Sequence, residues 1–264
     1  MAKTAFQYQR GNIWIQQDSV AYRNEVVRYL DLIRTTYAGR VLLKFINAIP
    51  KGILILPYKP TAADPVNAYA QPQSEPDAYT KGYSVMKGFD IPGFGTIQLP
   101  TAVFGTGAGS NVWLKYHPAT WRQYILNTGG IAPGSGPGEV LFHEMVHAQR
   151  MLEGKFIRTT VLEHIHMDDF EEFCAIVAAN IYRSERGFEL LRSDHWGNQA
   201  IRGPRADQAE YYNVYKAEFE RWYGSQPNFC RALAESPAKF NPLRIAVTSQ
   251  GVGVYTPMAL RQGS

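Results

Sequence analysis

One pentapeptide carries residue types at a spacing suited to chemistry: His143-Glu144-Met145-Val146-His147. The two histidines are four positions apart, so on a helix they lie on the same face, one turn from each other. Two imidazoles placed in this way can bind one zinc ion at about 2.0–2.1 Å. Glu144 then lies beside the ion, where it can take a proton from a bound water whose pKa the metal lowers to about 7. The pattern predicts a zinc site with Glu144 as general base.

A catalytic zinc ion needs a third protein ligand and one open coordination position. The candidates after the pentapeptide are two histidines and four acids, namely His164, His166, Asp168, Asp169, Glu171 and Glu172. On a second helix, small and apolar residues at 175, 176 and 179 mark the face that should be buried. Glu172 continues this face and Glu171 flanks it. A carboxylate on a buried face needs a partner, so we predict Glu172 as the third ligand, with Glu171 as the alternative.

Other histidines and one tyrosine are alternatives for roles at the same site. His164 and His166 form a rival ligand pair in a short extended stretch, but a ligand on the second helix fits the spacing better. His195 and Tyr182 are candidates to stabilise an oxyanion, and we interpret both as structural residues.

Helices are expected around this motif. A helix should run from Glu139 to a stop at Gly154, behind a Gly/Pro-rich approach, and the second helix should cover about residues 168–183. Other helical patterns cover residues 19–48 with a break at Gly39, then the ranges 207–223 and 229–234. We interpret the aromatic residues of 211–222 as core rather than as a binding surface.

Strands are expected at 52–58, near 96–99 and at 111–117, where short apolar or alternating runs are bounded by Gly and Pro. Residues 59–82 hold four prolines among small and polar residues, and predict a long loop or insert. No repeat or composition break divides the chain. We therefore expect one α+β domain over residues 1–264, in which a small sheet accompanies the two ligand-bearing helices.

Composition limits the classes of function. The 264 residues carry a formal net charge of +4 without a run of Lys and Arg, which argues against a nucleic-acid partner. No apolar stretch is long enough to span a membrane, and the N-terminus lacks the apolar segment of a signal peptide. Cys174 lies in an apolar run and should be a buried small side chain. We expect any export to use a specialised secretion system.

Two segments resemble a known family. They are Gly107-Ala-Gly-Ser-Asn-Val-Trp-Leu-Lys-Tyr-His-Pro and, after a Gly/Pro-rich loop, Val140-Leu-Phe-His-Glu-Met-Val-His-Ala. Together they resemble the NleD-like effector metallopeptidases, zinc proteases that bacteria inject into host cells. Glu172-Phe-Cys-Ala also resembles the Glu-Phe-Phe-Ala form of the ligand-bearing helix in anthrax lethal factor. There a second acidic residue follows four positions later, where this chain has Ile176.

The resemblance implies a zincin-like fold of the gluzincin class and a zinc-dependent endopeptidase. It further implies an effector or toxin that cleaves proteins of a target cell, with His143 and His147 as ligands, Glu144 as base and a ligand Glu on the next helix. The partner it implies is a protein or peptide substrate, and it assigns no chaperone or immunity protein. Two alternatives share the same motif: a zinc amidase acting on bacterial cell wall, and a non-catalytic binding protein with a vestigial site.

Overall fold

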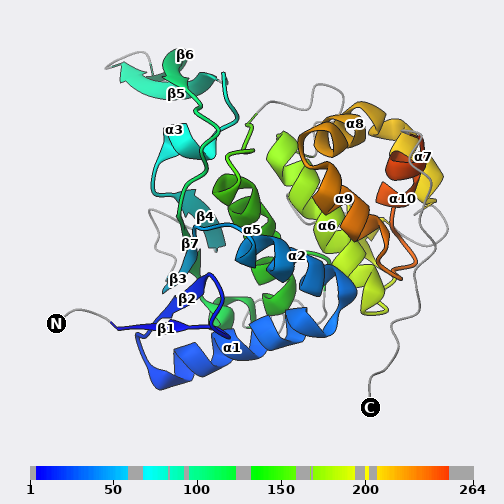
Figure 1. The fold of residues 1–264 in the computed structure, drawn as a ribbon, viewed down its shortest axis with the longest axis horizontal. Helices are drawn as coiled ribbons and strands as arrows, with labels where there is room; N and C mark the ends of the chain where they lie inside the picture. Colours follow the sequence, from blue (N-terminus) through cyan, green and yellow to red (C-terminus); the bar gives the residue numbers. More distant parts are fainter. Residues whose placement is uncertain are drawn as a thin grey trace.

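Helices pack against one face of a small mixed β-sheet (Figure 1). The computed structural model describes residues 4–58, 68–82, 84–91, 95–122, 132–158, 167, 169–193, 200–201 and 207–249. For residues 84–91, 95–103 and 200–201 it describes the backbone alone. The α+β class expected from the sequence is confirmed.

The sheet has five strands, β1 (Ala5–Gln7), β2 (Ile13–Gln16), β3 (Ile53–Pro57), β4 (Ala68–Pro72) and β7 (Val112–Tyr116), in the order β1-β2-β3-β7-β4. β2, β3 and β7 are parallel, whereas β1 and β4 pair antiparallel at the two edges. Alternate side chains such as Ile53, Ile55 and Leu114 are fully buried, as expected when helices cover one face. The predictions at 52–58 and 111–117 are confirmed by β3 and β7.

Residues 59–82 were predicted to be a loop or insert, and this prediction is wrong for the part that is described. β4 is a strand of the main sheet, and a short helix, α3 (Glu75–Ala78), follows it. Pro72 fits at the end of β4 because the strand lies at a sheet edge, where a missing N–H need not cost a ladder hydrogen bond. Residues 59–67 lie outside the described residues.

The helical pattern at 19–48 forms two helices, α1 (Val20–Thr35) and α2 (Tyr37–Asn47). The break falls at Thr36 and not at Gly39 as predicted. Thr36 has an extended backbone, and its side chain caps α2 by accepting a hydrogen bond from the N–H of Gly39. Both helices lie in the chain between β2 and β3 and provide the crossover that parallel strands require.

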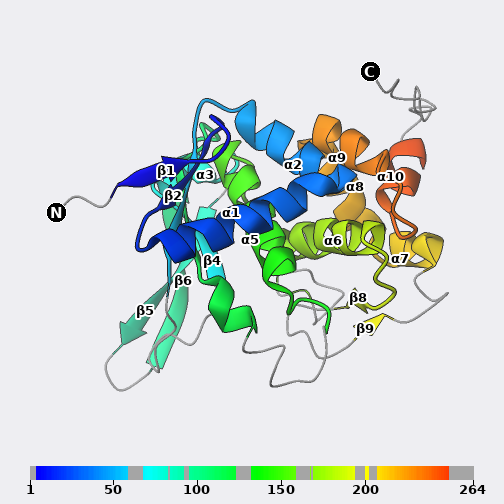
Figure 2. The same ribbon diagram turned by 90° about the horizontal axis from the view of Figure 1, so that it is seen from below.

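A long hairpin stands apart from the sheet and the helices. It consists of β5 (Ser84–Ile91) and β6 (Gly95–Phe104), which pair antiparallel. Figures 1 and 2 both show it extending away from the rest of the molecule. The strand predicted near 96–99 is therefore part of a longer element.

Two helices carry the predicted site, α5 (Pro137–Leu152) and α6 (Phe170–Glu185), and they pack side by side (Figure 2). α5 begins two residues earlier than predicted, because Pro137 suits the first turn of a helix. Asp169 caps α6 by accepting hydrogen bonds from the N–H groups of Glu171 and Glu172. Both predicted helices are confirmed.

The C-terminal end of α5 rests on the loop that leads into β7. Gly154 stops the helix with φ of +66°, and Gly109 of the loop has φ of +78°. The N–H of Ser110 bonds the carbonyl of Met151 at 3.0 Å. A Cβ on Gly109 would lie 1.9 Å from the carbonyl oxygen of Leu152, and one on Gly154 would lie 2.4 Å from that of Gly107. The two backbones can meet only because neither glycine has a side chain.

The last described helices are α7 (Gln208–Val214), α8 (Lys216–Ser225), α9 (Pro227–Ala234) and α10 (Leu243–Ser249). The single helix predicted at 207–223 is divided at Tyr215 into α7 and α8, and α10 was not predicted. The aromatic residues of this region are buried, namely Tyr211, Tyr212, Tyr215, Phe219 and Trp222. This confirms that they belong to the core.

Two short strands, β8 (Leu191–Arg192) and β9 (Ala200–Ile201), pair near the end of α6. Cys174 and Cys230 are both buried free thiols, and burial raises the pKa of each. Among the described residues, every helix is too short or too polar to cross a membrane.

Candidate metal centre

Helix α5 presents His143 and His147 on one face, with both side chains buried. Their Nε2 atoms lie 3.1 Å apart, and the rings are nearly perpendicular at 82°. The spacing of four residues brings the two rings together, as the sequence predicts. Two imidazole nitrogens held this close face a common point.

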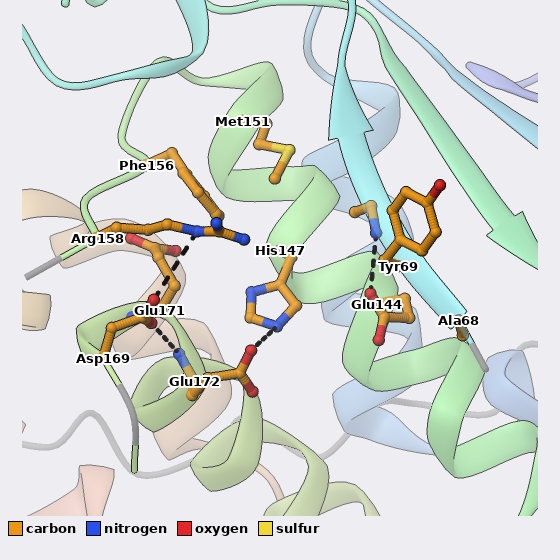
Figure 3. Close-up of a pocket in the computed structure, with 11 residues that line it drawn as sticks. Ala68, Tyr69, Glu144, His147, Met151, Phe156, Arg158, Asp169, Glu171 and Glu172 are labelled. Atoms are coloured by element: carbon orange, nitrogen blue, oxygen red, sulfur yellow. Dashed lines mark hydrogen bonds and ion pairs between the residues drawn. The ribbon is translucent and has the colours of Figure 1, made fainter. Parts of the chain in front are cut away.

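Glu172 reaches the same point from α6. Its Oε2 lies 3.2 Å from Nε2 of His143, and its Oε1 lies 3.3 Å from Nε2 of His147. Figure 3 shows the Glu172 carboxylate directed at the His147 ring. Ligand atoms from the three residues all lie within 4.8 Å of one another. The structure thus brings together the three residues predicted to bind the metal.

The separations suit a metal ion. Two atoms bound at about 2.0–2.1 Å to a tetrahedral ion are roughly 3.3–3.4 Å apart. The observed separations of 3.1, 3.2 and 3.3 Å are close to that value. The buried cluster of His143, His147 and Glu172 could therefore bind a metal ion with small adjustments of the side chains.

The pKa values of the two histidines are shifted in opposite directions. Burial lowers the pKa of His143 to about 3, so its imidazole is neutral, which is the form that binds metals. Burial also acts on His147, but the negative charge of Glu172 outweighs it and raises the His147 pKa to about 9. Burial raises the pKa of the Glu172 carboxyl, yet the charge of His147 and hydrogen bonds from both rings hold that pKa well below its usual range. Without metal, His147 and Glu172 form an ion pair.

Glu144, the predicted general base, lies in the same pocket as His147 and Glu172. Its Oε2 accepts a hydrogen bond of 3.0 Å from the backbone N–H of Ala70 in β4. Figure 3 shows Glu144 between α5 and the strand. The carboxylate is thereby fixed on the side of the pocket formed by the sheet edge.

The pocket combines ionisable and apolar side chains. Met151 and Phe156 line it together with the alanines of β4, and Arg158 and Asp169 also take part. Arg158 Nε is 3.8 Å from Asp169 Oδ2, and the Arg158 side chain is 65% exposed. His143 is not among the lining residues. The pocket therefore opens onto the cluster on the side of His147 and Glu172.

The relative burial of Glu171 and Glu172 is the reverse of what the sequence predicts. The Glu171 side chain is only 1% exposed, against 17% for Glu172, so Glu171 is the more buried. Glu171 nevertheless forms its ion pair with Arg150, and Glu172 is the acid that contacts the two histidines. The choice of Glu172 agrees with the structure, but the reason given for it, that Glu172 lies on the more buried face, is wrong.

The other candidates divide into two groups. His164, His166, Asp168 and His195 lie outside the described residues. Tyr182 is buried, stacks on Phe142 with ring centroids 4.6 Å apart and accepts a hydrogen bond from Arg186. It does not line the pocket, which agrees with a structural role.

Sequence reasoning missed the groups that surround the histidines. Arg192 Nη1 is 3.5 Å from Nδ1 of His143, the outer limit of a hydrogen bond. Both backbone polar groups of Arg192 bond the side chain of Asn180 at 2.8 Å. Nδ1 of His147 is buried and has no hydrogen-bond partner among the described residues. Ile176, at the position of the second acid in lethal factor, is fully buried and apolar.

Comparisons with known proteins add no relative. The chain matches no protein-family model and no curated protein.

Proposed function

We propose that this protein is a zinc-dependent hydrolase that cleaves peptide bonds, with His143, His147 and Glu172 as metal ligands. The observation that carries the proposal is the cluster of three ligand atoms beside a glutamate of the same helix and pocket. Two imidazoles and one carboxylate form one of the ligand sets of catalytic zinc sites, which keep a coordination position open. A zincin-like arrangement of α5 and α6 is part of the same proposal.

The roles of the residues follow from their positions. A bound zinc ion would polarise a carbonyl and lower the pKa of a water molecule. Glu144 acts as general base, since its carboxylate lies in the same pocket as His147 and Glu172, and it then delivers the proton to the leaving amine. The hydrogen bond from the backbone N–H of Ala70 orients the Glu144 carboxylate in the pocket.

The position of β4 supports a peptide as substrate. β4 is the last strand at its edge of the sheet among the described residues, and Ala68, Tyr69 and Ala70 line the pocket. The outer edge of a strand carries backbone groups that can pair with an extended peptide. A peptide added there would lie beside the pocket that Glu144, His147 and Glu172 line. Cleavage of proteins in a target cell is implied by the effector resemblance and belongs to the proposal.

The test combines metal analysis with cleavage. We expect wild-type protein purified without chelators to hold about one zinc ion per chain, as a catalytic site of this type requires. Glu144→Gln should keep the zinc and lose on the order of 10²–10⁴-fold in cleavage rate, the usual contribution of a general base. New N-termini in protein lysates treated with wild type, and absent with Glu144→Gln, would identify substrates.

Two results would overturn the proposal. Wild-type protein that contains no zinc would rule out the proposed metal centre. A Glu144→Gln variant that cleaves as fast as wild type would rule out Glu144 as the general base. Peptidoglycan treated in parallel separates a peptidase from a cell-wall amidase, because the same site could serve either substrate.

A further inference from the structure

We infer that Arg150 is a positioning residue for the metal centre: by holding Glu171, it fixes α6 so that Glu172 faces the histidines. The inference rests on the proposed metal centre. It starts from an arginine that is fully buried beneath the site, at the third position after His147 on the same helix.

Arg150 binds Glu171 through two parallel hydrogen bonds. Nε of Arg150 is 2.6 Å from Oε2 of Glu171, and Nη2 is 2.9 Å from Oε1. Their side chains are 0% and 1% exposed. A bidentate pair of this kind fixes direction as well as distance, because the guanidinium and the carboxylate must lie in one plane. Glu171 also accepts a hydrogen bond of 2.7 Å from the N–H of Ile157.

The guanidinium of Arg150 is itself held from other sides. Nη2 donates to the carbonyl of Lys155 at 2.8 Å, and Nη1 donates to the side chain of Gln226, between α8 and α9. Gln226 in turn donates to Gln149 and Glu153 of α5 and its neighbouring loop. Arg150 is thus anchored to the body of the protein and serves as a fixed reference for α6.

The position of Glu172 follows from that of Glu171. Neighbouring residues on a helix point about 100° apart, so fixing Glu171 against Arg150 fixes the direction of Glu172 as well. The two adjacent carboxylates are thereby assigned different partners: Glu171 bonds Arg150, and Glu172 lies 3.2 and 3.3 Å from the histidines. Arg150 therefore determines which of two neighbouring acids reaches the metal.

The same two helices supply a matched control. Glu139 of α5 and Arg183 of α6 form a second buried ion pair, 2.6 Å long, with side chains 5% and 3% exposed. On α5, Glu139 is four positions before His143, much as Arg150 is three positions after His147; on α6, Arg183 is eleven positions from Glu172. If breaking any buried ion pair weakens Zn²⁺ binding through a general loss of structure, substitution of Arg150 and of Arg183 should both lower the affinity. If Arg150 positions Glu172, only its substitution should lower the affinity.

The experiment compares full-length Arg150→Met and Arg183→Met with wild type. Affinity for Zn²⁺ is measured by competition with a chromophoric chelator, and the ligand field by the visible absorption of Co²⁺-loaded protein. We expect Arg150→Met to bind Zn²⁺ roughly 10–100-fold more weakly, as is typical for partners of metal ligands, and to change the Co²⁺ spectrum. Arg183→Met should keep both properties. Circular dichroism checks that each variant is folded.

Arg150→Lys serves as the second variant should Arg150→Met fail to fold. Lysine keeps the charge but cannot make two parallel hydrogen bonds, so an intermediate loss of affinity is expected. Wild-type affinity in either folded Arg150 variant would overturn the inference, as would an equal loss in Arg183→Met. Absence of Zn²⁺ binding by wild type would instead overturn the proposed function itself.

Discussion

The carboxylate of Glu144 accepts a hydrogen bond of 3.0 Å from the backbone N–H of Ala70, which ties the ligand-bearing helix α5 to the edge strand β4. The donor is a backbone group, so its position depends on the strand and not on a rotamer. If Glu144 is the general base, β4 both orients the base and forms the wall of the pocket.

Ala70→Pro tests this link, because proline lacks the N–H that Glu144 accepts. We expect the cleavage rate to fall by about tenfold, a part of the 10²–10⁴-fold that a general base contributes. Ala70→Gly keeps the N–H and is the control. Equal rates for the Pro and Gly variants would show that the contact has no role in the reaction.

Glu172→Gln tests the third ligand. An amide is a poor ligand for zinc, so the bound zinc should fall from about one per chain to a small fraction, measured by mass spectrometry of the metal. Asp169→Asn is the matched control, because Asp169 lines the same pocket and asparagine can keep its helix-capping role. Full zinc content in Glu172→Gln would exclude this carboxylate as a ligand.

Zinc binding should release a proton near neutral pH. The pKa of His147 is raised to about 9, so its ring is protonated below that pH, and it must lose the proton before it can bind metal. Affinity should therefore rise by up to about tenfold per pH unit between pH 7 and 9, and level off above. Calorimetric titrations in buffers of different ionisation enthalpy measure the proton directly. An affinity that is constant from pH 7 to 9 would contradict the expectation.

The buried pair of Glu139 and Arg183 makes a prediction about stability. Arg183→Met leaves the buried Glu139 carboxylate without its ion-pair partner and should lower the free energy of unfolding by about 3–5 kcal/mol, measured in urea. Replacing both members, as Arg183→Met with Glu139→Leu, should recover much of the loss, because two apolar side chains need no partner. If the double variant loses as much free energy of unfolding as the two single variants together, the unpaired buried charge is not the cause of the loss.

Local patterns were enough for the elements that bear the site. The period of apolar residues in α5 and α6 is strong, and Gly154 marks a stop that the structure confirms. The break between α1 and α2 was misplaced because a capping threonine is a weaker signal than a glycine inside a helical pattern. Proline content misled the prediction for β4, since an edge strand tolerates residues that a central strand does not.

The surroundings of the site could not be predicted, because they depend on residues far apart in the sequence. Arg150 meets Gln226 across 76 positions, and Ala70 meets Glu144 across 74. No periodicity links such pairs. One signal was available for Glu171: a cation one turn after His147 on a buried helix needs an acidic partner, and Glu171 is that partner.

The contact between Gly109 and Gly154 bears on how random mutagenesis of this chain should be interpreted. A side chain at either position would push the loop before β7 off the end of α5. Inactive clones from an unbiased library should therefore include substitutions at both glycines, although neither residue has a functional group. Such clones would report a displaced helix end, and they should not be taken as evidence of a second centre of activity.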